Sequence, residues 1–474
     1  MITKLQSFID RIKGKKIAII GAGISNRPLI AWLYPFNQDL TVFDMLESDD
    51  ARLQNTQRDF TNKGIHLHWI TGKDYLEELQ GFDLIFRTPK MRLDTPPILR
   101  ELDKGVEITS EIKLFTEVCP APLYAVTGSD GKTTTTTLIS EILKEAGHTV
   151  YTGGNIGTPL LDQIAKIRPE DRVVLELSSF QLMDMAPNPN VAVITNIIPN
   201  HLDFHLDFDE YIDAKKNMIL HQTNDRVLVL NAEDPVSFDL NTISKAELRF
   251  FNMKDQDLTT AYREGKALWL KKAEEAPKHI VDEQDVLLPG SFNLDNILAA
   301  ALATLDDVPL EAVESVARTF KGVPHRMELV KDVHNVRWYN SSVDSSPPRT
   351  IRTLSAFEER HIPLILITGG QDKNSDYSGL GQAILKATNR IILCGQNAEL
   401  IRHAIEKESA FMNANLSALQ ITEVDDYEAA VKMADRWSMP GDAVLLSPAG
   451  TSYDRFHHFE ERGARFKQLV MSLE

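Results

Sequence analysis

Short apolar runs alternate with amphipathic or polar stretches along most of this chain. In its first part the runs are 16–21 (KIAIIG), 40–44 (LTVFD) and 82–88 (FDLIFRT), and helical or polar segments separate them. Parallel strands joined by crossover helices produce this alternation. We therefore predict an α/β fold whose sheets are mostly parallel.

The same pattern restarts twice, and 474 residues exceed what one hydrophobic core usually serves. The second series begins with LYAVTG at 123–128, and the third follows FKGVPHRMELV at 320–330. Between them, residues 250–285 are charged and irregular with strand-like pieces, and 293–305 (NLDNILAAALATL) predict a helix. The predicted domain limits are 1–110, 111–322 and 323–474.

Composition and charge narrow the classes of partner. The chain has 51 Lys and Arg against 68 Asp and Glu, a formal net charge of −17, which disfavours nucleic acid and anionic membrane surfaces. Its two cysteines, Cys119 and Cys394, have no metal-ligand spacing, so a disulfide scaffold is excluded and a reducing compartment fits. The N-terminus has no apolar signal region, and no apolar run approaches the roughly 18 residues of a membrane span. We expect a cytoplasmic protein.

A first glycine turn follows the first strand. In 21–26 (GAGISN), two glycines of the pattern G-x-G-x-x-G are present, but Asn26 replaces the third, the one that brings helix and strand close in dinucleotide-binding folds. Ser25 and the N–H groups at the helix start could hold a phosphate, and Asp44 ends the next strand where a ribose-binding acid would stand. The turn indicates either a phosphate site or a tight connection without a ligand, and NAD is the less favoured ligand.

A second glycine turn, 127–134 (TGSDGKTT), lies between a buried strand and a Thr-rich helix. The phosphate-loop pattern G-x-x-x-x-G-K-[ST] has a valine in place of its first glycine, but its other parts are present. Gly128 and Gly131 allow backbone N–H groups to converge on phosphate oxygens. Lys132 can reach the β and γ phosphates, and Thr133 can ligate Mg²⁺. We predict that ATP binds here.

Motifs along nearly the whole chain resemble, in type and order, those of the Mur ligases. They are VTGSDGKTTTTTLI, GGNIGTPL, ELSSFQL, NIIPNHLDFH, YIDAKKNM, SFNLDNILAA, VPHRMELV, TGGQDKN and LSPAGTSYDRFHHFEERG. The resemblance implies three domains: a Rossmann-like N-terminal domain for a UDP-sugar, a P-loop-type central ATPase domain, and a Rossmann-like C-terminal domain for an amino acid.

The resemblance also implies a reaction. In this family ATP phosphorylates a terminal carboxylate, the amine of an amino acid attacks the acyl phosphate, and a tetrahedral intermediate expels phosphate. ELSSFQL and the last motif are the most specific, and they imply D-glutamate as the amine and UDP-N-acetylmuramoyl-L-alanine as the acid. ATP, Mg²⁺ at two sites, a role in peptidoglycan precursor synthesis and a monomeric state are expected with it.

The resemblance assigns metal ligands to strand ends. Glu176 ends the strand RVVLE beside the phosphate loop, where a carboxylate suits Mg²⁺ bound to ATP, and with Thr133 it is the implied ligand pair of the first ion. A lone histidine is more often structural than a ligand, and His205 stands close to His201 in the sequence. The resemblance selects His201 as a ligand of the second ion.

Lys215 is the implied carbamylated lysine. Taken alone, it is one of two adjacent lysines on a charged helix, with Lys216 as its competitor. Carbon dioxide converts such a lysine into a carboxylate-like anion that can hold the second Mg²⁺, and this requires a neutral amine with a lowered pKa. The implied catalytic residues are Lys132, Glu176, His201 and Lys215.

Further implied contacts are distributed over three ligands. The ATP contacts are Gly128, Ser129, Asp130, Gly131, Lys132, Thr133, Thr134, Asn293, Asn296 and Arg326. The UDP-sugar contacts are Ser25, Asp44, Thr88, Asn155 and His201. The amino-acid contacts are Lys373, Ser452, Tyr453 and Phe459.

Two stretches depart from the family pattern. Lys90 stands at the glycine position of a serine–proline–glycine run, where it either adds positive charge for the diphosphate or points to solvent. Later the chain reads YNSSVDSS, with Ser341 and Val343 in place of an aspartate and a lysine. Asp344 and Arg349 are the substitutes considered, and the way the D-glutamate side chain is held stays open.

Alternative functions are another Mur ligase, a folylpolyglutamate synthase-like amide ligase, and a nucleotide-binding protein that has lost catalysis. The first 110 residues, with their own glycine turn, weigh against the folate enzyme. The joint presence of Lys132, Glu176 and His201 weighs against the loss of catalysis.

Overall fold

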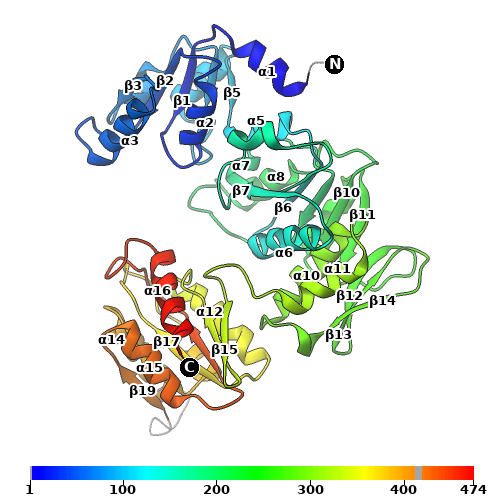
Figure 1. Cartoon of the computed structure of the whole chain (residues 1–474), viewed down its shortest axis with the longest axis vertical. Helices are drawn as coiled ribbons and strands as arrows, with labels where there is room; N and C mark the ends of the chain where they lie inside the picture. The colour runs from blue at the N-terminus through cyan, green and yellow to red at the C-terminus, as the bar shows by residue number, and fades with distance from the viewer. Residues whose placement is uncertain (1–2, 412–418, 474) are drawn as a thin grey trace. The chain divides into compact units, whose positions relative to one another are not determined.

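The computed structural model of the chain describes residues 3–411 and 419–473. Its strands form three sheets, and Figure 1 labels many of their elements. The fold is α/β and its sheets are mostly parallel, as the sequence predicts. By their internal contacts the residues form two compact units. The first comprises Met1–Glu264, Trp269–Ile280 and Asn296–Val313, and the second comprises Gly265–Leu268, Val281–Asp295 and Glu314–Glu474.

The first sheet has the strand order β3-β2-β1-β4-β5, and all its neighbouring strands pair in parallel. Its strands are β1 (Ile17–Ile20), β2 (Leu40–Asp44), β3 (His68–Thr71), β4 (Leu84–Phe86) and β5 (Glu107–Thr109). Its helices are α1 (Lys4–Ile12), α2 (Asn26–Leu33), α3 (Ala51–Asn62), η1 (Tyr75–Glu78) and α4 (Pro96–Asp103). Because the central strands are covered on both faces, they read as continuous apolar runs. The edge strands β3 and β5 lack such runs, and the pattern did not predict them.

The second sheet has the order β14-β13-β12-β11-β10-β9-β6-β8-β7, with parallel pairing from β7 to β12. Its strands are β6 (Leu123–Thr127), β7 (Val150–Gly154), β8 (Arg172–Glu176), β9 (Val191–Ile194), β10 (Val227–Asn231), β11 (Glu247–Phe251), β12 (Thr259–Glu264), β13 (Ala267–Lys271) and β14 (Lys278–Asp282). The stretch predicted to be irregular with strand-like pieces contains three further strands, β12, β13 and β14. Their burial is confined to a few positions each, which explains the weak apolar signal.

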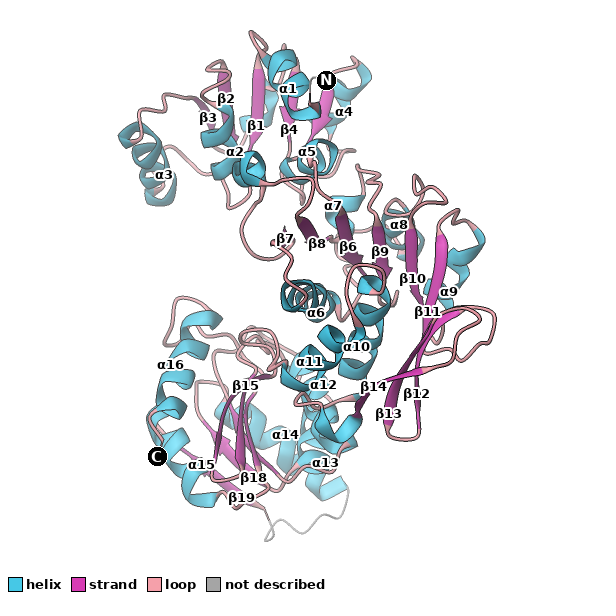
Figure 2. Ribbon diagram, turned by 45° about the vertical axis from the view of Figure 1, so that its right-hand side comes forward, coloured by secondary structure: helices cyan, strands magenta, loops and turns pink. Residues whose placement is uncertain are grey.

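Helices and short 3-10 turns accompany these strands, and α6 packs against β6, β7 and β8 (Figure 2). They are α5 (Glu111–Val118), α6 (Lys132–Glu145), η2 (Leu161–Lys166), α7 (Ser179–Leu182), α8 (Phe208–Lys216), α9 (Pro235–Asp239), η3 (Leu240–Thr242), η4 (Glu283–Asp285), α10 (Ser291–Thr304) and α11 (Leu310–Thr319). The helix predicted over 293–305 is α10.

The third sheet has the order β15-β16-β20-β17-β18-β19. An antiparallel hairpin of β15 (Glu328–Val333) and β16 (Val336–Asn340) flanks four parallel strands. These are β17 (Leu364–Thr368), β18 (Arg390–Leu393), β19 (Gln420–Glu423) and β20 (Ala443–Leu446). The helices are α12 (Pro347–Glu359), α13 (Leu380–Ala387), α14 (Ala398–Phe411), α15 (Tyr427–Trp437) and α16 (Phe459–Met471).

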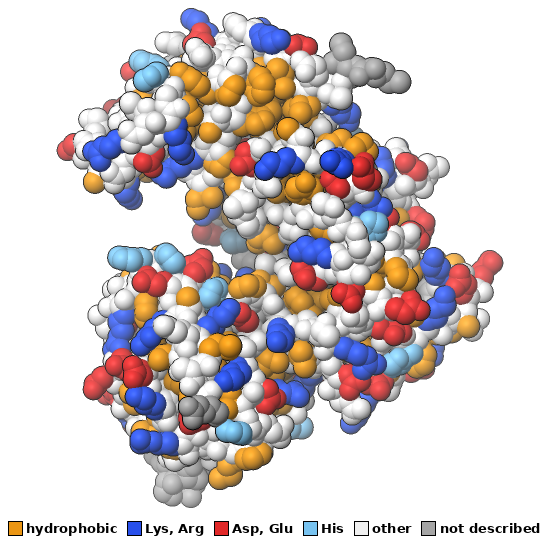
Figure 3. All heavy atoms as spheres, in the orientation of Figure 1, with side chains coloured by type: hydrophobic (Ala, Val, Ile, Leu, Met, Phe, Trp, Pro, Cys, Tyr) orange, Lys and Arg blue, Asp and Glu red, His pale blue; other side chains and the backbone are white. Residues whose placement is uncertain are grey.

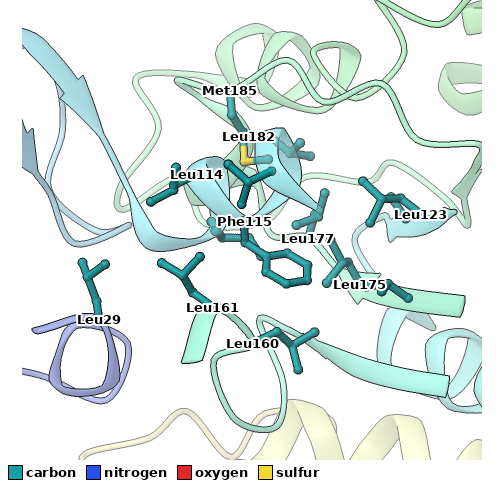
Figure 4. Close-up of a cluster of buried hydrophobic side chains, with 14 of the residues drawn as sticks. Leu29, Leu114, Phe115, Leu123, Leu160, Leu161, Leu175, Leu177, Leu182 and Met185 are labelled. Carbon is teal, nitrogen blue, oxygen red and sulfur yellow. The ribbon is translucent and has the colours of Figure 1, made fainter. Parts of the chain in front are cut away.

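A buried hydrophobic cluster fixes the strands that carry the phosphate loop. Figure 4 shows Phe115 of α5 facing Leu175 and Leu177 at the end of β8, with Leu160 and Leu161 beside them. Burial of one such side chain stabilises the fold by roughly 1.5–3 kcal/mol. The cluster therefore packs β6 and β8 against α5.

The face of the molecule drawn in Figure 3 is mixed in charge. On the face drawn in Figure 3, Lys and Arg side chains are interspersed with Asp and Glu. Within the described ranges, no helix combines the length and apolar character needed to span a bilayer.

Candidate active site

The phosphate loop joins β6 to the amino end of α6. Gly128 has φ +149° and Gly131 has φ +77°, which side-chain-bearing residues rarely adopt. A Cβ at Gly128 would also overlap the hydroxyl of Thr195, and one at Gly131 would overlap the amide of Asn296. Both predicted glycines are therefore required by geometry, and the 14-residue helix directs its first N–H groups into the loop.

Hydrogen bonds with the loop segment that follows β9 (Val191–Ile194) complete the phosphate loop. The Ser129 N–H donates to Asn196 O at 2.8 Å, and the Asp130 N–H donates to Asn196 Oδ1 at 3.0 Å. The Ser129 hydroxyl donates to Ile198 O at 2.8 Å and accepts from Ile198 N at 2.9 Å. Since Ser129 has one proton, Tyr211 donates its own hydroxyl to Ser129, at 2.9 Å. Thr134 is buried in the first turn of α6.

Lys132 and Thr133 face the loop from the start of α6. The Lys132 ammonium donates to Gly128 O at 2.9 Å and to Ser129 O at 3.0 Å. The Thr133 hydroxyl donates to Glu176 Oε2 at 2.7 Å, and the Asn155 amide donates to Glu176 Oε1 at 2.7 Å. This pairing follows from the parallel register of β6 and β8, which sets Val126 opposite Glu176.

The oxygen atoms of Thr133 and Glu176 are suitable ligands for Mg²⁺. A hydroxyl and a carboxylate in contact are hard oxygen ligands, and Mg²⁺ usually takes only one or two carboxylates, filling its octahedron with phosphate oxygens and water. No group of three or more His, Cys, Asp or Glu residues suited to a metal occurs in the part of the chain that the structure describes. An ion at Thr133 and Glu176 would therefore depend on the nucleotide phosphates for its remaining ligands.

Lys215 lies under the same loop. It is 1% exposed, and its ammonium donates to Gly128 O at 2.7 Å and to Thr127 Oγ1 at 3.3 Å. Burial, with the nearby Lys132 charge, holds the pKa of Lys215 well below its ordinary value. Lys216 instead points outward and pairs with Asp213 at 2.7 Å.

His201 lies on the loop between β9 and α8. Its backbone has φ 55°, and its ring lies 4.9 Å from the Phe180 ring. Partial burial and then the Lys132 charge lower the pKa of His201, which favours the neutral imidazole that can bind a metal. Lys132 and Lys215 both act electrostatically on this imidazole, so the structure brings His201 to the other site residues of the loop.

The first glycine turn is braced by side chains. The amide of Asn26, which replaces the third glycine, donates to Ile20 O at 2.9 Å and to Gly21 O at 3.0 Å. Asp44 accepts from Ala22 N at 3.0 Å through Oδ2 and from Leu46 N at 3.1 Å through Oδ1. In this arrangement Asp44 shapes the turn, and Thr88 borders it at Gly21.

A small cavity joins this turn to the second sheet. Ser25 and Asn26 line it together with Arg87, Gly154 and Gln181. The Oδ1 atom of Asn26 is buried and has no hydrogen-bond partner among the described residues. Since a buried polar atom normally has a partner, this orphaned oxygen supports a polar ligand here. Lys90 is exposed.

Two arginines in the loop after β4, Arg87 and Arg92, were not singled out by sequence reasoning. Arg87 is 2% exposed and forms an ion pair with Asp184, while donating to the carbonyl of Met91 at 2.7 Å. Arg92 pairs with Glu210 at 2.8 Å and also contacts Asp94. They anchor the 87–95 loop to the elements around α7 and α8. Both arginines lie in residues 87–96 (RTPKMRLDTP), the stretch around Lys90 that departs from the family pattern. This departure was the sequence signal that could have pointed to them.

Asn293 and Asn296, two of the implied ATP contacts, differ in their hydrogen bonds. Asn296 accepts a hydrogen bond from Thr135 Oγ1 of α6 at 3.1 Å, which joins α10 to the helix of the phosphate loop. Asn293 donates to Pro289 O at 2.7 Å. Arg326 is exposed at the start of the second unit's sheet, where it acts electrostatically on Asp344.

In the second unit, the loops after β17 and β20 lie side by side. Gln371 and Thr451 exchange backbone hydrogen bonds of 2.8 and 2.9 Å. The Lys373 ammonium consequently lies 5.2 Å from the centre of the Tyr453 ring, a cation–π contact. Ser452 beside it is 2% exposed.

Phe459 is the first residue of α16. Its carbonyl accepts from Ser342 Oγ at 2.8 Å, and its ring lies 6.2 Å from His325. Arg462, which sequence reasoning missed, is 1% exposed and donates to Ser342 Oγ at 3.0 Å and to Thr451 O at 3.0 Å. It ties the predicted amino-acid loops together.

Asp344 and Arg349, considered as substitutes for the aspartate and the lysine of the family pattern, form hydrogen bonds within their own unit. Asp344 is buried and accepts from Ser447 Oγ at 2.7 Å, and burial raises its pKa. Arg349 donates to Val343 O at 2.9 Å, and the Ser341 hydroxyl accepts from Met327 N at 3.3 Å. These contacts give Asp344 a structural position in the core of its sheet.

Known proteins match this chain over its whole length. The family model of the Mur ligase middle domain matches residues 126–304, and that of the Mur ligase glutamate ligase domain matches 325–450. The UDP-N-acetylmuramoylalanine–D-glutamate ligases of Acetivibrio thermocellus and Ruminiclostridium cellulolyticum are 43% and 42% identical to this chain, each over 100% of both sequences.

Solved structures agree in fold. The UDP-N-acetylmuramate-alanine ligase of Thermotoga maritima superposes with a TM-score of 0.56 at 18% identity, covering 97% of this chain and 99% of its own. A UDP-N-acetylmuramoyl-L-alanyl-D-glutamate–2,6-diaminopimelate ligase gives 0.55 at 19% identity, covering 92% and 93%. With full-length relatives above 40% identity and matches to both domain models, the chain belongs to the Mur ligase family.

Proposed function

We propose that this protein is an ATP-dependent ligase that joins D-glutamate to UDP-N-acetylmuramoyl-L-alanine in peptidoglycan precursor synthesis, releasing ADP and phosphate. Full-length relatives at 43% and 42% identity carry the name of that ligase. The observation that carries the proposal is the clustering of Lys132, the Thr133–Glu176 pair and the buried Lys215 around one phosphate loop.

A carboxylate is a poor acylating group until its oxygen is phosphorylated. The γ-phosphoryl group passes to the alanyl carboxylate, and ADP leaves. The amine of D-glutamate, after losing a proton, attacks the acyl carbon, and the tetrahedral intermediate collapses with expulsion of phosphate. Lys132 and the N–H groups of Gly131 and Thr133 neutralise and orient the phosphates, so the protein acts by positioning and charge compensation.

Two Mg²⁺ sites belong to the proposal. Thr133 and Glu176 would hold one ion on the phosphates of ATP, and His201 with carbamylated Lys215 would hold the other. Bound Mg²⁺ supplies charge neutralisation at the phosphoryl group. The lowered pKa of Lys215 leaves a neutral amine, which adds CO₂ to give N–COO⁻ and one released proton.

The other two substrates are assigned to the remaining sheets. Ser25, Asp44, Thr88 and Asn155 would contact the UDP-sugar, and the paired loops with Lys373, Ser452, Tyr453 and Phe459 would contact D-glutamate. The domain limits 1–110, 111–322 and 323–474 divide the chain accordingly. Asn293, Asn296 and Arg326 would complete the ATP site. We place the reaction in the cytoplasm, where ATP and UDP-sugars are available, and propose a monomer.

An amino-acid panel tests the proposal. The purified protein is incubated with ATP, Mg²⁺, UDP-N-acetylmuramoyl-L-alanine and one amino acid, and phosphate release is measured. D-Glutamate should give rapid release, while L-lysine, meso-diaminopimelate and L-alanine should give background rates. Equal rates with another amino acid would reject the specificity, and release without the UDP-sugar would reject the assigned acid.

A further inference from the structure

His205 occupies a buried position among the residues of the proposed site. It is 2% exposed, although it lies four residues after the exposed His201. Its Nε2 atom lies 2.9 Å from the hydroxyl of Ser179, and its Nδ1 atom lies 3.3 Å from Oε2 of Glu210. The Nδ1 atom makes no hydrogen bond among the described residues, so its contact with Glu210 is electrostatic. The Nε2–Ser179 hydrogen bond and the packing around the ring define the orientation of the imidazole.

Aromatic side chains pack against the ring of His205. It stacks on Phe180 at 5.8 Å with an interplanar angle of 6°, and Tyr211 meets it edge-on at 5.3 Å. Phe180 also contacts the His201 ring at 4.9 Å. The backbone N–H of His205 donates to His201 O at 3.0 Å. A displacement of His205 would therefore reach His201 through both the backbone and Phe180.

Tyr211 contacts both His205 and the phosphate loop. Its hydroxyl donates to Ser129 at 2.9 Å, and the Lys215 ammonium lies 4.6 Å from the centre of its ring. On the other side of His205, Ser179 lies three residues after Glu176. One imidazole thus contacts segments that position all three of Glu176, His201 and Lys215.

Glu210 is itself fixed by the first-sheet loop. Arg92 donates to both carboxylate oxygens of Glu210, at 3.0 and 2.8 Å, and to Phe204 O at 2.9 Å. Glu210 also accepts from Leu206 N at 2.8 Å. A two-point pairing of guanidinium and carboxylate has a defined geometry, so Arg92 limits the positions that Glu210 can offer to His205.

We propose that His205 is a positioning residue, held by Ser179 and by the Arg92–Glu210 pair, which fixes the His201 loop for binding of the second metal ion. This inference rests on the proposed function, because it takes His201 and Lys215 as the second metal site. Partners behind the ligands of a metal commonly change its affinity by about 10- to 100-fold when they are removed.

The test is a Mn²⁺ titration followed by electron paramagnetic resonance, with a non-hydrolysable ATP analogue and UDP-N-acetylmuramoyl-L-alanine present. H205F keeps an aromatic ring against Phe180 and Tyr211 but loses both polar contacts. We expect the wild type to bind two Mn²⁺ ions, and H205F to bind the second about 10- to 100-fold more weakly with the first unchanged. In turnover, kcat should fall while KM for ATP stays close to the wild-type value.

Controls separate this inference from the proposed function. S179A removes the Nε2 partner and leaves His205 itself intact, so we expect it to weaken binding of the second ion less than H205F does. S179A also replaces H205F in the test where H205F does not fold. His221 is exposed, and H221F should bind both ions normally. A wild type that binds one Mn²⁺ would contradict the two-metal site. Two normal Mn²⁺ sites in H205F, or in S179A where H205F is unfolded, would overturn the positioning role.

Discussion

At the scale of single residues, burial distinguishes side chains that the sequence leaves equivalent. Lys215 and Lys216 are adjacent on α8, yet Lys215 is 1% exposed under Gly128, whereas the Lys216 side chain is 37% exposed and paired with Asp213. The choice between them came from the family pattern. Their charge and spacing alone favoured a solvated surface for both, because helical phase near the end of a short helix is poorly defined by sequence.

The buried lysine gives the first prediction. K215A should lose at least about 100-fold in kcat, the order of magnitude for removal of a charged group from a preorganised site. Short carboxylic acids such as acetate should restore part of the activity, because they supply the missing carboxylate beside His201. K216A should retain nearly full activity. Assays with and without acetate decide this, and an active K215A would refute the carbamate.

Glu111 gives a prediction about pH. It is 6% exposed at the start of α5, and burial raises its pKa to about 7, with the Leu161 N–H as a partial offset. The unfolded carboxyl titrates near 4.5. Below that pH the group is protonated in both states, so stability is lost as the pH rises from about 4.5 to about 7, where the folded state must ionise a buried acid.

E111Q should therefore unfold at a higher temperature than the wild type at pH 8, with little difference at pH 4.5. The gain in free energy of unfolding is at most about 3 to 4 kcal/mol, from 1.36 kcal/mol for each unit between 4.5 and about 7. Thermal unfolding without ligands across this pH range provides the measurement. E170Q, at an exposed turn position, should show no such pH-dependent gain, and an equal gain there would contradict the explanation.

At the scale of elements, the strands with continuous apolar runs were predictable from the sequence, and the strands at the edges of the sheets were not. β1, β6 and β17 are buried throughout, and their sequences show it. β14 is buried at two positions, and the charged stretch around it hides its strand character. The phosphate loop was predictable because a strand, two glycines, a lysine and a helix occur in fixed order. Contacts made across elements, such as His205 with Ser179, leave no local pattern in the sequence.

Two glycines at opposite ends of α6 give a matched comparison. Gly128 precedes the helix, and Gly147 follows it with φ +90° and open space around it. G128A and G147A should both destabilise the protein by about 1 kcal/mol or more, since alanine is strained in these conformations. G128A should in addition weaken ATP binding, because its methyl group would displace Thr195 from the loop. Calorimetric titration with ATP and Mg²⁺ should thus separate the two variants, and equal affinities would argue against a rigid loop.

At the scale of the whole molecule, the two glycine turns serve different sheets. The first ends β1 and is braced by Asp44, and the second ends β6 and contains Lys132. Sequence similarity between the turns does not say whether they bind the same nucleotide. Their surroundings differ, since the second has Glu176 and Lys215 beside it and the first has the orphaned amide oxygen of Asn26. We expect one to take the UDP end of a sugar nucleotide and the other to take ATP.

A crossed ligand test separates the two turns. A ligand present at 100 times its Kd stabilises the folded state by about 2.7 kcal/mol, so UDP and ADP with Mg²⁺ should each raise the unfolding temperature of the wild type. D44A removes the acceptor of the Ala22 and Leu46 N–H groups and should lose the UDP effect while keeping the ADP effect. K132A should show the reverse, because its lost ammonium belongs to the phosphate loop alone. If either variant folded and lost both effects equally, the two turns would not be independent sites for different nucleotides. If UDP stabilised D44A as well as the wild type, Asp44 would not support UDP binding at the first turn.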